Sequence, residues 1–343
     1  MTALIPRVRT MAEPVISLVV PFYNEREVLP ECVARLARVM AGTGLPFEAV
    51  FVDDGGTDGG AEWLMARCTE RPWIRVVRLS RNFGKEAALT AGLDHARGEA
   101  VVVLDADLQD PPECIPAMIQ RWRAGADVVL MQRRSRPGET RLKRISAHLF
   151  YRLLRGLSRS DIPADTGDFR LMSRRAVEAI RRLDERNRYM KGLFAWVGLP
   201  TVVLRYDREA RVAGDSKWGY WRLVGLALEG ITSFSVAPLR WAAVIGALAA
   251  MLGGGYGLWI IAKALMFGVA VRGYPSLTAL ITFLGGLQLL TIGIVGEYVG
   301  KVYLETKQRP IYLVRDVVDR ASLRREPAPP RRRSLGVPHA DAG

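Results

Sequence analysis

The chain has 343 residues, a formal net charge of +14 and a pI near 10.1. This length allows one large domain with a smaller part, and the charge favours an anionic partner such as nucleic acid, a membrane surface or a phosphorylated ligand. Three cysteines and three histidines without metal-ligand spacing argue against a zinc site and a Cys–His nucleophile, so acid–base chemistry falls to carboxylates.

Residues 1–14 have no apolar core or small-residue cleavage site, so we expect a flexible lead-in instead of a secretory signal. From residue 15 to 212, strand and helix patterns alternate, which predicts an α/β domain with a doubly wound, mostly parallel sheet. The expected strands are Val15–Pro21, Phe47–Asp53, Ile74–Leu79, Ala100–Leu104 and Asp127–Leu130. The expected helices are Glu25–Met40, Asp58–Cys68, Lys85–Ala96 and Pro112–Ala124.

Polar residues follow two of these strands closely. Asp53 and Asp54 end the second strand and are placed to hydrogen-bond a base or a ribose. Arg81 and Lys85 flank a turn that leads into a helix, a position suited to anionic donor groups. The nearby glycines fit neither a dinucleotide-binding fingerprint nor a P-loop. Taken alone, each of these loops is more typical of an ordinary turn or helix cap.

The strand Ala100–Leu104 runs directly into the acidic stretch DADLQD. Side chains alternate along an extended chain, so Asp105 and Asp107 point roughly the same way at the strand's carboxyl end. Two close carboxylates repel each other unless a positive charge lies between them, and oxygen ligands suit Mg²⁺ or Mn²⁺. With Gln109 as a neutral oxygen ligand, this predicts a cation site. The alternative is an acidic turn that caps the next helix.

The second part of the chain predicts a membrane segment over residues 237–298. Within it, residues 241–262 and 274–296 carry no charge, and each is long enough to cross a hydrocarbon core of about 30 Å. A buried helical hairpin of a soluble protein is the alternative. Residues 213–236 mix aromatic, aliphatic and basic side chains, as an interfacial amphipathic helix does.

Basic residues are more frequent on the outer flanks of the two apolar stretches than at their connector. The positive-inside rule therefore predicts a multi-pass protein of the inner (plasma) membrane, with the large domain and both termini in the cytoplasm. The tail, 299–343, is rich in Arg, Pro and Ala from Arg315 on, which predicts disorder with a boundary near residue 320.

In their order and spacing, VVPFYNE, VDDGGTD, SRNFGKEAAL and DADLQDPPE resemble the family 2 glycosyltransferases of GT-A fold, which use a nucleotide-sugar and a divalent cation. The resemblance runs from about Val15 to Tyr312. The stretch ADTGDFRLMSRRAV and the membrane segment resemble the branch that loads sugar onto a polyprenyl phosphate, which includes bactoprenol glucosyltransferases and dolichol-phosphate mannose synthases. One departure is Gly56, where the family usually has serine.

The resemblance implies donor-side roles for the strand ends. Asp105, Asp107 and Gln109 would hold Mg²⁺ or Mn²⁺ at the donor diphosphate, and Asp107 is the residue on which transfer would depend most. Asp53 and Asp54 would recognise the nucleoside. The other implied donor-binding residues are Pro21, Tyr23, Glu25, Arg81 and Lys85.

The acceptor-side residues follow from the same resemblance. Arg133, Arg134 and Arg170 are candidates for the lipid phosphate, because guanidinium groups match phosphate oxygens. The alternative for the first two is a solvated basic loop beside anionic lipid. Asp165 and Asp168 would line the junction of sugar and acceptor, where one acts as a base or holds sugar hydroxyls.

These features predict an inverting, metal-dependent enzyme that moves a hexose, first choice glucose from UDP-glucose, to undecaprenyl or another polyprenyl phosphate. A GDP-mannose-dependent polyprenyl-phosphate mannose synthase and a transferase that elongates a lipid-linked glycan remain open. A nucleic-acid-binding protein is disfavoured because no binding module is recognised, and an inactive membrane scaffold is disfavoured by the intact DAD and Gln109. The resemblance and the small residues of the first apolar stretch predict self-association, with a tetramer as first expectation.

Overall fold

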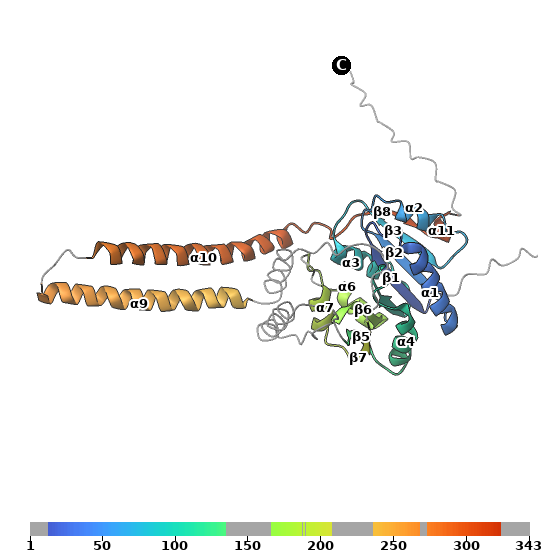
Figure 1. Cartoon of the computed structure of the whole chain (residues 1–343), viewed down its shortest axis with the longest axis horizontal. Helices are drawn as coiled ribbons and strands as arrows, with labels where there is room; N and C mark the ends of the chain where they lie inside the picture. The colour runs from blue at the N-terminus through green and yellow to red at the C-terminus, as the bar shows by residue number, and fades with distance from the viewer. Residues whose placement is uncertain are drawn as a thin grey trace, which may run out of the picture.

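A computed structural model describes residues 13–134, 166–186, 188, 190–207, 236–267 and 273–323 (Figure 1). In these ranges, eight strands form one sheet in the order β7-β5-β6-β4-β1-β2-β3-β8. The strands are β1 Ile16–Phe22, β2 Phe47–Asp53, β3 Ile74–Leu79, β4 Ala100–Val103, β5 Val128–Arg133, β6 Thr166–Ser173, β7 Thr201–Tyr206 and β8 Val314–Val318. Six of them run in one direction, and β6 and β8 run against their neighbours. The predicted mostly parallel α/β sheet is confirmed.

Helices cover both faces of the sheet, because the central strands are apolar on both sides. Ile16, Leu18 and Val20 belong to one buried cluster, whereas Val19 belongs to the other. The first cluster contains buried residues of α1 (Leu29–Thr43), α2 (Gly60–Met65) and α4 (Ile115–Arg123). Cys114 of η1 (Pro112–Cys114) packs against it. The second includes α3 (Lys85–His95), α6 (Arg174–Arg181) and α7 (Met190–Trp196).

Helix α3 approaches the sheet closely, which fixes the position of its first residue, Lys85. At Gly92 in this helix, an added Cβ would lie only 2.2 Å from Cγ1 of Val19 in β1. Glycine therefore allows a helix-to-strand distance that any larger residue would increase.

Several predicted boundaries differ from the structure, among them that of the first helix, which begins at Leu29 and not at Glu25. The first strand does not stop at Pro21 but continues to Phe22. The pairing of β1 with β4 ends before Pro21, because its last hydrogen bond runs from the N–H of Leu104 to the carbonyl of Val19. The missing N–H of Pro21 therefore costs no hydrogen bond between these two strands. The fifth strand extends beyond Leu130 to Arg133.

The C-terminal tail contributes an edge strand that its composition did not predict. Val314–Val318 pairs antiparallel with β3 and is followed by α11 (Arg320–Leu323). The Arg-, Pro- and Ala-rich composition from Arg315 on gave no sign of this strand, which lies before the predicted disorder boundary near residue 320. Pairing with β3 satisfies backbone groups along an edge that β3 would otherwise expose.

Two long helices run side by side away from the sheet domain, α9 (Ala237–Phe267) and α10 (Tyr274–Thr306) (Figure 1). Their segments Pro238–Trp259 and Phe283–Thr306 are long and apolar enough to cross a membrane, and almost none of either is buried within the chain. The buried-hairpin alternative is thereby disfavoured. The expected interfacial helix, 213–236, lies almost entirely outside the described residues.

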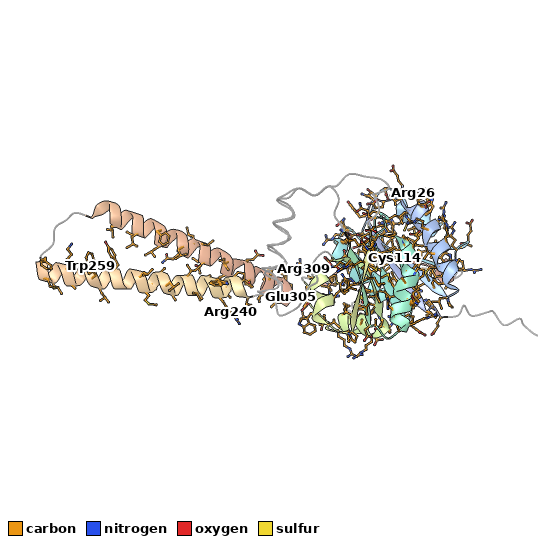
Figure 2. The ribbon with its side chains drawn as sticks, turned by 60° about the horizontal axis from the view of Figure 1, so that its bottom comes forward. Arg26, Cys114, Arg240, Trp259, Glu305 and Arg309 are labelled. Carbon is orange, nitrogen blue, oxygen red and sulfur yellow. The ribbon has the colours of Figure 1, made fainter. Side chains whose placement is uncertain are left out.

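The C-terminal end of α10 is attached to the sheet domain. The backbone N–H of Arg186 donates to both carboxylate oxygens of Glu305, at 2.8 and 3.1 Å, and the Arg186 guanidinium donates to the carbonyl of Arg309. Figure 2 shows Glu305 and Arg309 at this junction and Trp259 towards the far end of α9. The helical pair is thus tied to the domain at one end.

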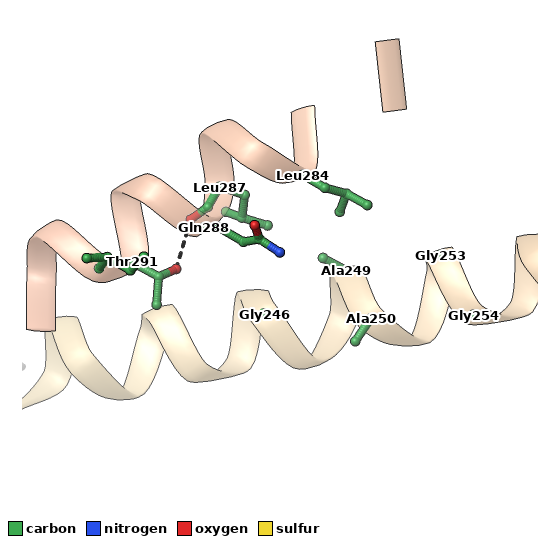
Figure 3. Close-up of a pocket in the computed structure, with 10 residues that line it drawn as sticks. Gly246, Ala249, Ala250, Gly253, Gly254, Leu284, Leu287, Gln288 and Thr291 are labelled. Atoms are coloured by element: carbon green, nitrogen blue, oxygen red, sulfur yellow. Dashed lines mark hydrogen bonds between the residues drawn. The ribbon is translucent and has the colours of Figure 1, made fainter. Parts of the chain in front are cut away.

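Between α9 and α10 lies a hollow of about 540 Å³ (Figure 3). Small residues of α9, including Gly246, Ala249 and Gly253, form one wall, and Leu287, Gln288 and Thr291 of α10 form part of the other. The Thr291 hydroxyl donates to the Leu287 carbonyl within its own helix. This hollow belongs to the helical pair and not to the strand ends considered next.

Candidate active site

The polar residues predicted for the site gather at one edge of the sheet. The parallel strands β1 to β5 end at this edge, and β6 begins there because it runs in the opposite direction. Residues that follow β4 therefore meet residues at the start of β6, although more than sixty positions separate them. In open α/β sheets, ligands bind at this carboxyl edge.

An ion-paired cluster occupies the centre of the edge. The Lys85 ammonium lies 2.8 Å from Oδ1 and 2.9 Å from Oδ2 of Asp105, and 2.6 Å from Oδ2 of Asp168. Partial removal of this half-exposed ammonium from water lowers the pKa of Lys85, but the charges of the two carboxylates outweigh that effect and raise the pKa above its ordinary value. The lysine thus remains a cation that neutralises part of the acidic set.

The turn after β4 holds Asp107 and Gln109. Asp107 is 7% exposed, and its Oδ1 accepts a hydrogen bond from the backbone N–H of Gln109 at 3.1 Å. Between them, Leu108 is fully buried and has a φ of +58°, a left-handed conformation that is uncommon for a leucine. Burial of the Leu108 side chain offsets that cost and fixes the carboxylate of Asp107 below the surface.

A second polar cluster, formed by Asp110, Tyr206 and Arg133, was not predicted as a unit. The Tyr206 hydroxyl donates to Oδ1 of the buried Asp110, and Nε of Arg133 donates to the Tyr206 oxygen at 3.2 Å. Burial raises the pKa of Asp110, and the charge of Asp105 raises it further. Arg133 is therefore held at the end of β5, and the solvated-loop alternative is wrong for it.

The only sequence signal for this cluster was weak. Tyr206 ends β7, a strand missing from the predicted set, and Asp110 is the third carboxylate of DADLQD. The two residues are 96 positions apart, so nothing local joins them.

Arg170 takes a different position from the one predicted for it. It is 2% exposed, and its guanidinium donates to the carbonyls of Gly167, at 2.7 Å, and Asp168, at 3.2 Å. It also lies over the Phe194 ring, 3.8 Å from the centroid. Burial lowers its pKa to about 10. In this arrangement Arg170 supports the start of β6, where Asp168 lies, and its buried guanidinium gives no support to the predicted contact with an acceptor phosphate.

Asp53 and Asp54 both have partners within the protein. Asp53 accepts from the N–H of Gly56 at 2.8 Å and pairs with Arg78 at 3.5 Å. Asp54 accepts from the N–H groups of Phe83 and Gly84, which shapes the loop before α3. Burial raises the pKa of both carboxyls. Their predicted contact with the nucleoside stays a prediction.

The loops that follow β2 and β3 are in direct contact. Gly55 has a φ of +72°, and a Cβ added to it would lie 2.4 Å from the carbonyl carbon of Arg81. At Gly56, the departure from the family pattern, a Cβ would lie 2.8 Å from Oδ1 of Asp53. The two loops consequently pack as one surface.

The remaining predicted residues occupy mixed environments. Tyr23 and Arg81 are exposed, with the Arg81 guanidinium over the Phe83 ring, whereas Pro21 is buried within β1 and Glu25 is half-buried. Arg134 is exposed and pairs with Asp207 at 3.4 Å. Asp165 lies outside the described residues. The structure thus groups Lys85, Asp105 and Asp168 most tightly.

Known proteins match most of this chain. Residues 17–181 fit the model of glycosyl transferase family 2. Over 302 residues the chain is 47% identical to a prophage bactoprenol glucosyl transferase homolog of Escherichia coli, covering 88% of this chain and 99% of the relative. This chain belongs to glycosyltransferase family 2. The family resemblance predicted from the four motifs is confirmed.

Two further comparisons extend the picture of this glycosyltransferase. The SfII prophage-derived bactoprenol glucosyl transferase of Shigella flexneri is 49% identical over 300 residues, covering 88% of this glycosyltransferase and 97% of the relative. A crystal structure of glucosyl-3-phosphoglycerate synthase from Mycobacterium tuberculosis, with Mn²⁺, UDP-glucose and phosphoglyceric acid, is 21% identical and covers 64% of this chain and 78% of its own, with a TM-score of 0.43. At that distance the ligands of one enzyme do not carry over to the other.

Proposed function

We propose that this glycosyltransferase moves a hexose, glucose from UDP-glucose in the first instance, onto the phosphate of a polyprenyl lipid. The observation that carries the proposal is the 47–49% identity to proteins named as bactoprenol glucosyl transferases, over nearly their whole length. The alignment with the Escherichia coli relative covers 302 of the 343 residues. The part left out is shorter than α9 and α10 together, so the likeness includes part of the helical pair.

The acidic residues fit a divalent cation. Among the residues that the structure describes, no three His, Cys, Asp or Glu side chains form a metal cluster by themselves. Both oxygens of Asp105 nevertheless already contact a positive group, the Lys85 ammonium, and Asp107 follows two residues later. Carboxylate oxygens are the ligands that Mg²⁺ and Mn²⁺ prefer. Asp105, Asp107 and Gln109 would hold the cation, which would neutralise the charge of the departing nucleoside diphosphate.

The donor-side groups supply positive charge next to these carboxylates. Lys85 is the first residue of α3, where the free N–H groups of a helix favour an anion, and Arg81 is exposed in the preceding loop. Both are suited to the donor's diphosphate. Tyr23, half-exposed at the end of β1, offers a ring face for the base, beside Asp53 and Asp54.

The acceptor requires positioning more than activation. A lipid phosphate is already anionic at neutral pH, so its oxygen can attack the anomeric carbon without a strong base. The new C–O bond forms as the bond to the nucleoside diphosphate breaks on the opposite face, which inverts the anomeric configuration. Arg133, held by Tyr206, is the best-placed arginine for the phosphate, with Arg134 beside it. Asp168 would line the sugar.

The helical pair supports a membrane location for this reaction. Arg240 lies near the start of α9 and Lys301 near the end of α10, and these ends lie on the side of the domain. Lys263 is at the far end. By the positive-inside rule the catalytic domain and both termini lie in the cytoplasm, at the inner (plasma) membrane. An acceptor confined to the membrane explains why the enzyme is anchored there.

Self-association through the helical pair accompanies this proposal, with a tetramer as the expected form. The small residues of α9 permit close helix contact, and the amide of Gln288 projects into the hollow at membrane depth (Figure 3). A polar side chain in hydrocarbon favours a polar partner, such as the same glutamine of a second copy. Crosslinking in membranes, with Gln288→Leu as the variant, tests this; an unchanged crosslinking pattern would contradict it.

The deciding experiment measures sugar transfer to undecaprenyl phosphate in membranes from a panel of radiolabelled UDP- and GDP-sugars, with and without EDTA. We expect label in the organic phase from UDP-glucose, lost with EDTA and with Asp107→Ala. Restoring activity with Mg²⁺ or Mn²⁺ separately identifies the preferred cation. Asp184→Ala, an exposed carboxylate outside the site, is the matched control and should retain transfer.

Other results would change the assignment in distinct ways. Label from GDP-mannose alone would make the enzyme a mannose synthase. If no donor labels the lipid while the protein still hydrolyses one of them, the acceptor assignment is wrong and elongation of a lipid-linked glycan takes its place.

A further inference from the structure

Lys85 occupies the place where a cation would bind Asp105. Its ammonium contacts both oxygens of that carboxylate, at 2.8 and 2.9 Å, and holds Asp168 at 2.6 Å on the other side. Asp105 is thus already neutralised by a charge that belongs to the chain itself. Any divalent cation that uses these oxygens competes with this lysine.

The competition follows from distance and charge. Mg²⁺ and Mn²⁺ bind carboxylate oxygens at little more than 2 Å, so an ammonium within 3 Å of both oxygens would face a divalent cation at close range. Two positive groups at that separation repel strongly in a partly buried site. The ammonium therefore has to leave Asp105 when a metal binds there.

Without the sugar donor, the Lys85 ammonium has few other negatively charged partners. Lys85 is the first residue of α3, where the helix dipole disfavours a positive side chain. Asp168 remains as one partner, but losing Asp105 leaves part of the ammonium unpaired. A diphosphate would supply the missing acceptor oxygens, because the ammonium and the start of the helix both favour an anion at the same place.

We propose that Lys85 makes cation binding at Asp105 conditional on the nucleoside diphosphate. Without donor, the ammonium holds Asp105 and Asp168 and weakens metal binding; with donor, it transfers to the diphosphate and releases Asp105 to the metal. This inference rests on the proposed function. Lys85 acts as a positioning residue that couples the two ligands, and such couplings are reciprocal.

The test measures Mn²⁺ binding, not activity. The full-length chain in detergent is titrated with Mn²⁺, with and without UDP, and free Mn²⁺ is followed by electron paramagnetic resonance. We expect Lys85→Met to bind Mn²⁺ alone about five- to tenfold more tightly than wild type, at the lower end of ordinary coupling factors. Lys85→Arg, which keeps the charge, should bind Mn²⁺ alone as weakly as wild type.

Controls separate this effect from general charge and from misfolding. Arg175→Met removes one positive charge from an exposed side chain paired with Asp127 at the opposite edge of the sheet, and should bind Mn²⁺ as wild type does. If Lys85→Met does not fold, as judged by circular dichroism, Lys85→Gln replaces it.

Two outcomes would overturn the proposal, and they are distinguishable. If the neutral variants bind Mn²⁺ alone no more tightly than wild type, while UDP still strengthens binding, Lys85 does not couple the ligands and the proposed function stands. If wild type binds no Mn²⁺ even with UDP, the metal requirement of the proposed function fails together with this inference.

Discussion

Arg75 of β3 and Asp319, 244 positions later, form an ion pair with 3.3 Å between Nη2 and Oδ2. The pair fastens the segment that follows the helical pair α9 and α10 to the sheet. Burial raises the pKa of Asp319, but hydrogen bonding from the Ser322 N–H and the charge of Arg75 outweigh it, so the pKa lies below its ordinary value. The carboxylate is therefore more favourable in the docked state.

The docking of β8 should weaken in acid. Because the folded-state pKa of Asp319 is depressed, its stabilisation is present above the unfolded pKa, about 3.9, and is lost as pH falls through the lower folded value. Asp319→Asn should cost about 1 kcal/mol of local stability at neutral pH and lack this loss in acid. Hydrogen exchange of Val314–Val318 measures both. Identical pH profiles in variant and wild type would show that Asp319 does not hold the strand.

Tyr206→Phe should affect stability and acceptor binding together. The change removes the hydroxyl that donates a hydrogen bond to the buried Asp110 and accepts one from Arg133. Its loss should lower the free energy of unfolding by about 1–3 kcal/mol. Since Arg133 loses its positioning partner, KM for polyprenyl phosphate should rise several-fold while KM for the sugar donor changes little. Denaturant unfolding and transfer kinetics provide the measurements.

The double variant Asp110→Asn/Tyr206→Phe controls for the buried charge. It should recover part of the stability lost in Tyr206→Phe, because a neutral amide costs less to bury unpaired than a carboxylate, but it should not recover the acceptor KM. A wild-type KM in Tyr206→Phe would contradict the positioning role.

Gly55→Ala should be far more destabilising than an ordinary glycine replacement. Both the positive φ and the approach of the Arg81 backbone, 2.4 Å from the new Cβ, oppose the methyl group, so we expect a loss of at least about 3 kcal/mol. Gly44→Ala is the matched control: its φ is +64°, but nothing lies within 4 Å, and it should cost about 1 kcal/mol. Thermal unfolding compares them, and equal losses would mean that the loop contact is unimportant.

Arg170→Lys should slow transfer although the charge is kept. A lysine cannot reproduce the planar guanidinium that holds the carbonyls of Gly167 and Asp168 and stacks on Phe194, so Asp168 loses its support. We expect kcat to fall about tenfold or more, equivalent to the loss of about 1.5–3 kcal/mol of charge-assisted hydrogen bonding. Arg175→Lys, an exposed arginine, should leave kcat unchanged. A kcat of Arg170→Lys within twofold of wild type would exclude this supporting role.

Local patterns sufficed for the elements that their own residues specify. The apolar runs that become β1 to β4 are buried on both faces, and this requirement is visible in their composition. The acidic end of β4, the turn before Lys85 and the two uncharged stretches that became α9 and α10 are likewise contiguous in the chain. Their order then predicted a parallel sheet with its polar residues along one edge.

Contacts between distant segments were decided by the tertiary structure. Strand β6 inserts antiparallel between β4 and β5, and only this pairing places Asp168 within 2.6 Å of Lys85. The same is true of Tyr206 beside Asp110 and of β8 beside β3. Strand pairing depends on which edges remain open after the rest of the sheet has formed, so no local period records it. The sequence alone thus predicted which residues carry the chemistry, and the fold decided which of them meet.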